Sequence, residues 1–312
     1  MSDFIKHECG LGFVRLLKPL SYYQEKYGSS LYGLEIMQLL LQKQRNRGQD
    51  GAGLATIKLD AEPGYRYISR KRSNSVNYIK DLFSGIYSHF EDLPAAQLND
   101  PVWLKDNKPY TGEVILGHLR YGTHGDNSIE TVHPFLRQSN WISRNLVLAG
   151  NFNMTNVEEL FGELVNYGQY PKEHSDTVTV MEKIGHFLDE EVQRLFDWFK
   201  PEGFSKQEIN KLIFDHLDLQ RVLRRATRKF DGGYVIAGML GHGDAFVLRD
   251  PSGIRPAFYY QDDEIVALAS ERPALQTALD VRWHQVKELE RGHALIIKHD
   301  GKVAEMPVME QL

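Results

Sequence analysis

The sequence predicts an α+β fold with two antiparallel sheets flanked by helices. Short runs that are typical of strands gather in the first half of the chain, up to residue 152, and again from residue 232 onward. Three helical segments lie between these two groups. Strand groups separated by helices favour layers of sheet covered by helix over a regular alternation of strand and helix.

The first half of the chain is expected to contain five strands and two helices. The strands are expected at residues 9–15, 52–59, 65–70, 113–121 and 145–152, and the helices at 29–47 and 76–92. The helix over 29–47 has leucines and a methionine at helical spacing. Ser29 or Ser30 can cap its start, and Gly48 can end it.

The middle of the chain is expected to be helical. Thr155 and Glu158 have the spacing of a capping box before the first of these helices. A second helix is expected from Asp176 to Phe196. Ser205 and Glu208 form another capping-box pattern, which opens a charged helix that extends to about residue 229. Short strands follow from residue 232, then a helix at 271–279 and a last strand at 293–298.

Composition and charge exclude several classes of protein. The 312 residues are 42% hydrophobic and 25% charged, as in an ordinary globular chain that forms one large layered domain or two domains. The formal net charge of −5 does not favour a nucleic-acid partner. The first ten residues lack the apolar core of a secretory signal, and no apolar run is long enough to span a bilayer. We therefore expect a cytoplasmic protein.

Several common catalytic patterns are missing from the sequence. There is no P-loop, no complete dinucleotide fingerprint, no nucleophile elbow and no zinc-ligand spacing such as HExxH or CxxC. No metal site is expected. Cys9 is the single cysteine, so it cannot form an intramolecular disulfide, and it is either a buried core residue or a nucleophile.

Four polar, glycine-containing segments lie next to predicted strands or helices. They are RNRGQDGAG (45–53), GHLRYGTHG (117–125), LAGNFNMTN (148–156) and EHSDTVT (173–179). Each has a structural alternative when taken alone. Arg47 and Asp50 could form an ion pair at a helix end, Arg120 could be a surface charge, Asn151 could serve a turn, and Asp176 could cap a helix. Loops held by rigid elements are also where binding groups concentrate.

Taken together with CGLGFV (9–14), these segments resemble the class II, N-terminal-nucleophile (Ntn) glutamine amidotransferases. Five motifs in the family's order make the resemblance specific, and it spans residues 9 to about 300. VLRDPSGIRPAFYY (247–260) and ALASERPAL (267–275) resemble segments of amidophosphoribosyltransferases in particular. The resemblance implies the four-layer αββα sandwich of Ntn hydrolases.

The resemblance also implies a catalytic set. The thiol of Cys9 would attack the side-chain amide of glutamine, and the freed α-amine of the same residue would accept the proton. Asn151 would donate its amide to the oxyanion, together with the backbone N–H of Phe152. The family usually has glycine at the position of Phe152, so a positive φ there would strain the larger residue.

The substrate-binding residues are likewise implied by the resemblance. Arg120 would grip the α-carboxylate of glutamine, since a guanidinium can bind a carboxylate with two parallel hydrogen bonds. Asp176 would pair with the α-ammonium. Thr123 and His124 would line or support the pocket. Arg47 and Gly48 would form a loop on the glutamine side, with Asp50 in a structural role.

The ends of the chain carry further expectations. Residues 1–8 are expected to be a propeptide, whose removal frees the Cys9 amine, and residues 301–312 a linker. In amidophosphoribosyltransferases, a phosphoribosyltransferase domain in cis consumes the ammonia, and no segment here matches it. We therefore expect a piece of a longer protein. The alternative is a glutaminase that stands alone beside a separate synthase. No cofactor is expected for the glutaminase, and magnesium only with the missing domain.

Two other functions are compatible with the sequence. The same fold could supply ammonia to another acceptor, in asparagine or amino-sugar synthesis, although the 247–260 segment argues against the amino-sugar enzyme. A non-catalytic regulatory module that is never processed is the third possibility, which the phenylalanine at 152 and the leader favour slightly. The sequence leaves open whether the chain forms a homo-oligomer, and it does not explain the long helical segment at 187–229.

Overall fold

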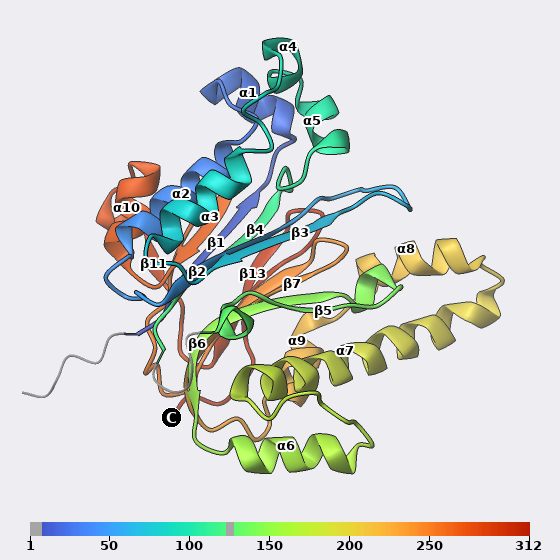
Figure 1. The fold of residues 1–312 in the computed structure, drawn as a ribbon. Coiled ribbons are helices and arrows are strands. Elements are labelled where there is room, and N and C mark those ends of the chain that lie inside the picture. Colours follow the sequence, from blue (N-terminus) through green and yellow to red (C-terminus); the bar gives the residue numbers. More distant parts are fainter. Residues whose placement is uncertain (1–7, 123–127) are drawn as a thin grey trace, which may run out of the picture. The chain divides into compact units, whose positions relative to one another are not determined.

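A computed structural model describes residues 8–122 and 128–312 of the chain. These residues divide into two compact units. The first comprises the described residues up to Pro134 together with Ala149–Asn151 and Pro256–Glu288, and the second Phe135–Leu148, Phe152–Arg255 and Leu289–Leu312. Each unit is built on one antiparallel sheet, which Figure 1 shows with its helices. The predicted fold class is confirmed by these two sheets with flanking helices.

The sheet of the first unit has seven strands within the described residues, in the order β11-β9-β10-β1-β4-β2-β3. The strands are β1 (Gly10–Leu16), β2 (Gly51–Ile57), β3 (Ile68–Ser73), β4 (Val114–Arg120), β9 (Phe258–Gln261), β10 (Ile265–Ala269) and β11 (Lys287–Glu288). β1, β2 and β4 are buried along their whole length. This explains why their sequences are mostly apolar and do not alternate between apolar and polar residues.

Six helices accompany this sheet in the described part of the first unit. They are α1 (Leu20–Tyr27), α2 (Tyr32–Lys43), α3 (Tyr78–Tyr87), α4 (Ala95–Leu98), α5 (Pro101–Asn107) and α10 (Arg272–Leu279). α2 packs on β1 and β4, and α3 on β2 and β3. Helices α1, α4 and α5 were not predicted. The predicted cap of α2 at Ser29 or Ser30 is wrong, because the helix begins at Tyr32 and the residue in the capping position is Leu31.

Glycines allow α2 to approach the sheet closely. Gly12 of β1 lies opposite Gly117 of β4 in the strand register. A Cβ atom on Gly117 would lie 2.5 Å from Sδ of Met37, and one on Gly12 2.9 Å from the same sulfur. Met37 is fully buried, so any added side-chain atom here must displace a close-packed neighbour.

The sheet of the second unit has six strands within the described residues, in the order β13-β12-β8-β7-β6-β5. They are β5 (Phe135–Arg137), β6 (Leu146–Met154), β7 (Gly232–Leu240), β8 (Ala245–Arg249), β12 (His293–Ile297) and β13 (Val303–Pro307). β13 pairs with β12 through the whole of its length. The segment 301–312, which the sequence analysis expects to be a linker, therefore contains a strand of this sheet.

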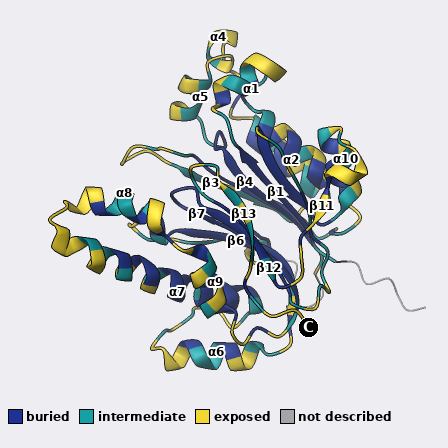
Figure 2. Ribbon diagram, turned by 180° about the vertical axis from the view of Figure 1, so that it is seen from behind, coloured by how far each residue is buried: buried dark blue, intermediate teal, exposed yellow. Residues whose placement is uncertain are grey.

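Four α-helices belong to the second unit as described. They are α6 (Val157–Asn166), α7 (Asp176–Phe199), α8 (Lys206–His216) and α9 (Leu219–Ala226). Figure 2 shows that β6 and β7 are mostly buried while the outer faces of α6 and α8 are exposed. The buried faces of the four helices form one apolar cluster with the sheet. No helix in the described ranges is both long and apolar enough to cross a membrane.

Two predictions about these helices are wrong and one is confirmed. Thr155 does not cap α6, because the helix begins after Asn156, and the Thr155 hydroxyl donates to Asp231 instead. The single helix expected from Ser205 to residue 229 is two helices, since the chain turns at Leu217 and the side chain of Asp218 caps α9. The Ser205–Glu208 capping box is present as predicted.

The close approach of α2 to the sheet leads to a stability prediction. Gly117→Ala should lower the free energy of unfolding by about 1–3 kcal/mol, because its Cβ overlaps the Met37 sulfur. Denaturant unfolding of the purified chain measures this change. The double variant Gly117→Ala/Met37→Ala should lose less free energy of unfolding than the sum of the losses in the two single variants.

Gly162→Ala is the matched control for this prediction. Gly162 lies in α6, and no atom lies within 4 Å of the position of an added Cβ. That substitution should leave stability unchanged or raise it by up to about 1 kcal/mol. Equal losses for Gly117→Ala and Gly162→Ala would contradict the packing argument.

Candidate functional site

Cys9 lies where β1 begins and β4 ends. Gly10 pairs with Leu119 in the register of these strands, so the residue before β1 meets the residues that follow β4. The backbone N–H of Tyr121 donates to Sγ of Cys9 at 3.4 Å, and the thiol donates to the Tyr121 carbonyl at 3.8 Å. Cys9 is half-buried. The thiol therefore lies at the end of two inner strands of the sheet, and not inside the core, where the structural alternative would put it.

The turn that carries Arg47 and Gly48 is held against the end of β4. A Cβ atom on Gly48 would lie 2.6 Å from the backbone carbonyl of Leu119, so no other residue fits without moving the strand. The hydroxyl of Tyr78 donates to the Gly48 carbonyl at 2.7 Å. Arg47 extends from this turn, and its Nε donates to the backbone carbonyl of Cys9 at 3.2 Å.

Asp50 holds the backbone of the segment after Arg120. Its Oδ2 accepts from the N–H of Gly122 at 2.7 Å, and its own N–H donates to the carbonyl of Arg120 at 3.0 Å. A Cβ atom on Gly122 would lie 3.3 Å from both Nη atoms of Arg120, so the guanidinium lies close over this backbone. Asp50 thus orders the loop, which fits its expected structural role better than an ion pair with Arg47.

Two buried histidines hold the backbone beside Asn151. The ring of His118 donates through Nε2 to the carbonyl of Gly150 at 3.0 Å, and Nδ1 of His133 accepts from the N–H of Gly150 at 3.2 Å. The two rings stack with centroids 4.3 Å apart. Burial lowers the pKa of His118 to about 4 and holds the pKa of His133 well below its usual range. Both rings are therefore neutral near pH 7.

Glu8 is a residue of this site that the sequence analysis assigned only to the leader. Its Oε2 lies 2.9 Å from Nη2 of Arg47 and accepts from Nδ2 of Asn151 at 3.4 Å. Asn151 is buried, with 4% of its surface exposed. Glu271, which precedes α10, also approaches Arg47, with 3.5 Å between its Oε1 and Nη1. The position of Glu8 directly before the nucleophile is the only signal in the sequence that could have indicated this contact.

The first unit therefore contains Cys9, Arg47, Gly48, Arg120 and Asn151. Contacts link three of them, since Arg47 bonds to the Cys9 backbone and Asn151 shares the Glu8 carboxylate with Arg47. Gly48 packs on Leu119 of β4. The assigned catalytic and binding roles stay predictions. Thr123 and His124, expected to support the pocket, lie outside the described residues.

Phe152 and Asp176 belong to the second unit. Phe152 lies in β6 and its side chain packs against the apolar cluster of that unit. It is not among the described non-glycine residues with positive φ, which are Asp60, Tyr110 and Asp280. The strain considered for Phe152 in the sequence analysis is therefore not present, and its backbone N–H stays the expected oxyanion donor.

Asp176 is the first residue of α7, immediately after the capping residue Ser175. Its Oδ1 accepts from the backbone N–H of Thr177 at 2.7 Å. Burial raises the pKa of Asp176 above its ordinary value. A cation beside this carboxylate would offset that effect, as the predicted α-ammonium of glutamine does. This pairing stays a prediction.

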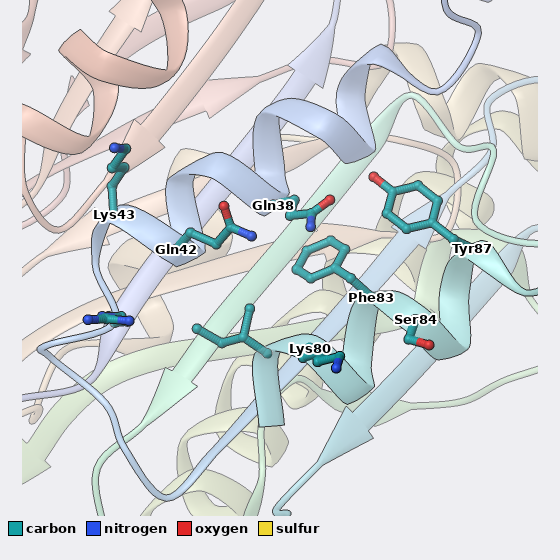
Figure 3. Close-up of a pocket in the computed structure, with 9 residues that line it drawn as sticks. Gln38, Gln42, Lys43, Lys80, Phe83, Ser84 and Tyr87 are labelled. Atoms are coloured by element: carbon teal, nitrogen blue, oxygen red, sulfur yellow. The ribbon is translucent and has the colours of Figure 1, made fainter. Parts of the chain in front are cut away.

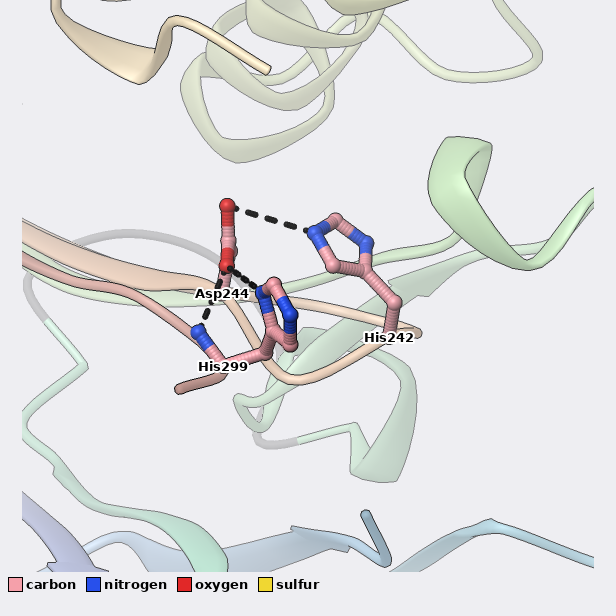
Figure 4. Close-up of side chains that lie close together, drawn as sticks. All are labelled: His242, Asp244 and His299. Atoms are coloured by element: carbon pink, nitrogen blue, oxygen red, sulfur yellow. Dashed lines mark hydrogen bonds and ion pairs between the residues drawn. The ribbon is translucent and has the colours of Figure 1, made fainter. Parts of the chain in front are cut away.

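The second unit also contains a polar cluster that includes none of the predicted site residues. His242, Asp244 and His299 have ligand-type atoms within 4.8 Å of one another. Figure 4 shows these three side chains. The Lys298 ammonium, however, bonds to Asp244 and also to the carbonyls of Phe214 and Leu217. Because this internal cation already neutralises the carboxylate, the cluster is a network that ties the end of α8 to β12.

One surface hollow of the first unit, formed by described residues, lies between α2 and α3 and has a volume of about 670 Å³ (Figure 3). It is lined by Gln38, Gln42, Lys43, Arg45, Ile79, Lys80, Phe83, Ser84 and Tyr87. None of the predicted site residues is among them. The hollow therefore does not support the assignment of the site, which rests on the contacts around Cys9.

Comparisons with known proteins agree with the resemblance found in the sequence. No protein-family model matches the chain. The amidophosphoribosyltransferase of Pasteurella multocida is 26% identical over 265 residues, which cover 83% of this chain and 42% of that protein. The amidophosphoribosyltransferase of Methanocaldococcus jannaschii is 25% identical over 295 residues, which cover 95% of this chain and 48% of that protein.

A solved structure shows the same fold. The glutamine phosphoribosylpyrophosphate amidotransferase of B. subtilis, complexed with ADP and GMP, superposes with a TM-score of 0.59 at 21% identity, over 97% of this chain and 50% of that one. The chain thus spans about half the length of the relatives that it matches. The resemblance to glutamine amidotransferases, and to amidophosphoribosyltransferases among them, is confirmed.

The neutral histidine pair leads to a pH prediction. Because the folded pKa of His118 is below the ordinary value of 6.5, its stabilising contribution is present above pH 6.5 and is lost as the pH falls toward 4. One pKa unit corresponds to about 1.4 kcal/mol, so the loss by pH 4 is up to about 3 kcal/mol. Denaturant unfolding between pH 7 and pH 4 measures it.

His118→Gln keeps a donor for the Gly150 carbonyl and removes the titrating ring. The variant should lose less stability than the parent chain over the same pH interval. The exposed His284, replaced by glutamine, is the control and should follow the parent. Parallel pH profiles for the parent and His118→Gln would contradict the assignment.

Proposed function

We propose that this chain is the glutaminase domain of an amidophosphoribosyltransferase. It would hydrolyse L-glutamine to glutamate and ammonia, and the ammonia would aminate phosphoribosyl diphosphate in purine synthesis. The observation that carries the proposal is the contact set around the single cysteine. The Cys9 thiol bonds to Tyr121 next to the buried Arg120, and the Cys9 carbonyl bonds to Arg47. The amidophosphoribosyltransferases named above support the choice of acceptor.

The proposed reaction proceeds through a thioester. Sγ of Cys9 attacks the side-chain carbonyl carbon of glutamine, the C–N bond breaks, and ammonia leaves with the thiol proton. Water then attacks the thioester carbonyl, which releases glutamate and restores the thiol. The negative oxygen that develops in both steps would accept hydrogen bonds from Nδ2 of Asn151 and the backbone N–H of Phe152.

The base in this scheme is the α-amine of Cys9 itself. An α-amine has an ordinary pKa of about 7.7–8.0, so it can accept a proton near neutral pH, whereas a peptide nitrogen cannot. Residues 1–8 are therefore proposed to be a propeptide whose cleavage from Cys9 creates the base.

Arg120 and Asp176 would bind the amino-acid end of glutamine. The guanidinium of Arg120 would take the α-carboxylate with two hydrogen bonds, and the carboxylate of Asp176 would take the α-ammonium. Arg120 is buried and Asp176 is half-buried, which strengthens their attraction to a ligand of opposite charge. Arg47, Gly48, Thr123 and His124 complete the proposed pocket.

The partner in the proposal is a phosphoribosyltransferase domain in cis or a separate synthase, and magnesium would act there. The glutaminase itself needs no cofactor in this scheme, and a cytoplasmic location is part of the proposal. The curated relatives named above do not favour asparagine or amino-sugar synthesis as the destination of the ammonia. The contacts of Cys9 likewise give no reason to prefer a non-catalytic module.

The proposal predicts the N-terminus of the active protein. Active preparations should begin at Cys9 by mass spectrometry. Glutamate release should be lost in Cys9→Ala, which keeps the backbone and Cβ of the residue but removes the nucleophilic sulfur. Glu25→Ala, at an exposed site on α1, is the control and should keep full activity. Full activity in a chain that still begins at Met1 or Ser2 would refute the proposed base.

Arg120→Lys is predicted to raise the KM for glutamine by tenfold or more, because one ammonium cannot replace two parallel hydrogen bonds from a planar group. Steady-state glutaminase kinetics measure the change. Arg66→Lys, at an exposed position, is the matched control and should leave KM unchanged. An unaltered KM in Arg120→Lys would remove this residue from the binding site.

A further inference from the structure

The carboxylate of Glu8 occupies two donors of the proposed site, the guanidinium of Arg47 and the side-chain amide of Asn151. Nη2 of Arg47 lies 2.9 Å from its Oε2, and Nδ2 of Asn151 donates to the same oxygen at 3.4 Å. Asn151 is the proposed donor to the oxyanion of the substrate. An anionic oxygen of the leader thus lies on this donor, one residue before the nucleophile.

We infer that Glu8 is an internal ligand of the glutamine site, and that the Arg47–Asn151 pair is a subsite for a side-chain carboxylate. The carboxylate of Glu8 has the same chemistry as the γ-carboxylate of glutamate, the proposed product. The leader therefore acts as a tethered product mimic that excludes glutamine until it leaves. This inference rests on the proposed function.

The guanidinium of Arg47 is fixed by three different partners. Nε bonds to the carbonyl of Cys9, Nη1 lies 3.5 Å from Glu271, and Nη2 bonds to Glu8. Glu271 and the Cys9 carbonyl are independent of the leader side chain, so they keep the guanidinium in place when Glu8 departs. Leader removal would then leave Nη2 and Nδ2 of Asn151 aimed at one point, ready for a carboxylate or amide oxygen of a ligand.

The burial of these groups makes the contact effective. The side chain of Arg47 is 14% exposed and that of Glu8 is 28% exposed, so water screens the pair only in part. A charge-assisted hydrogen bond in such a setting is stronger than one between neutral groups. Glu8 is also covalently attached beside the site, so its effective concentration there far exceeds that of most free ligands.

The stacked histidines explain why Asn151 stays available to such a ligand. His118 and His133 hold both polar groups of the Gly150 peptide. The Asn151 backbone is therefore fixed whether or not Glu8 is bound, and its side-chain amide can pass from leader to substrate without a rearrangement of the strand.

The inference is tested by glutamine binding in a chain that keeps its leader. Cys9→Ala provides this background, with leader retention checked by mass spectrometry. Calorimetry should show that Cys9→Ala/Glu8→Ala binds L-glutamine at least about tenfold more tightly than Cys9→Ala alone. Cys9→Ala/Glu25→Ala removes an exposed carboxylate elsewhere and should bind as Cys9→Ala does.

A second measurement uses a synthetic peptide of residues 1–8 in trans. The peptide should inhibit glutamate release by a chain that begins at Cys9 competitively with glutamine, and the same peptide with Glu8→Ala should inhibit at least about tenfold less. Equal glutamine affinities in the two leader-bearing variants, or equal inhibition by the two peptides, would overturn the inference.

The two proposals fail in different ways. If the chain beginning at Cys9 releases glutamate while Glu8→Ala changes neither affinity nor inhibition, the proposed function stands and Glu8 is only a cleavage-site residue. If that chain releases no glutamate, the proposed function fails. If no leader-bearing variant binds glutamine, including the one with Glu8→Ala, exclusion by Glu8 is refuted.

Discussion

The antiparallel pairing of β1 with β4 is the constraint on which the rest of the site depends. It sets Gly10 against Leu119, and the Cys9 thiol consequently meets Tyr121. A slip of one residue would turn every side chain of β1 to the opposite face. The contact of Gly12 and Gly117 with Met37 resists such a slip, because larger residues do not fit there. Core packing beneath α2 thus determines the position of a thiol at the end of β1.

The polar groups around that thiol are arranged so that few of them can move. Arg47 has a separate partner for each of its three nitrogens, and Asp50 bonds to the backbone on both sides of Tyr121. The two histidines are neutral and fill opposite roles, one donating to Gly150 and the other accepting from it. Prearranged donors of this kind stabilise developing charge without reorganisation during a reaction.

The sequence predicted most of the long elements, because their signals are local. The strand at 9–15, the helix that begins at Asp176 and the strands after residue 232 correspond to β1, α7 and β7–β8. Short pieces such as β5, α4 and β13 were missed, since three to five residues carry little periodicity. The cap at Thr155 was wrong because Asn156, one residue later, precedes the helix. The break at Leu217 was missed because helical patterns continue on both sides of it.

The candidate site was predicted from motifs rather than from distances. Those motifs identified Cys9, Arg47 and Asn151, which the structure connects through the Cys9 backbone and Glu8. They could not reveal Glu8 or the histidine pair, because those hydrogen bonds join residues that are 17 to 143 positions apart in the chain. Only the folded strand register brings such positions together. Asp176, in the second unit, stays a motif-based assignment.

The measurement that tests the account most directly compares two chains that both begin at Cys9. One has a free α-amine and the other an acetylated α-amine, prepared by joining a synthetic N-terminal peptide to the rest of the chain. The free-amine chain should hydrolyse glutamine with a rate that rises with pH as its amine loses a proton, near the ordinary pKa of about 7.7–8.0. The acetylated chain should be inactive at every pH. Equal rates for the two chains would show that the terminal nitrogen is not the base, and would contradict the central claim.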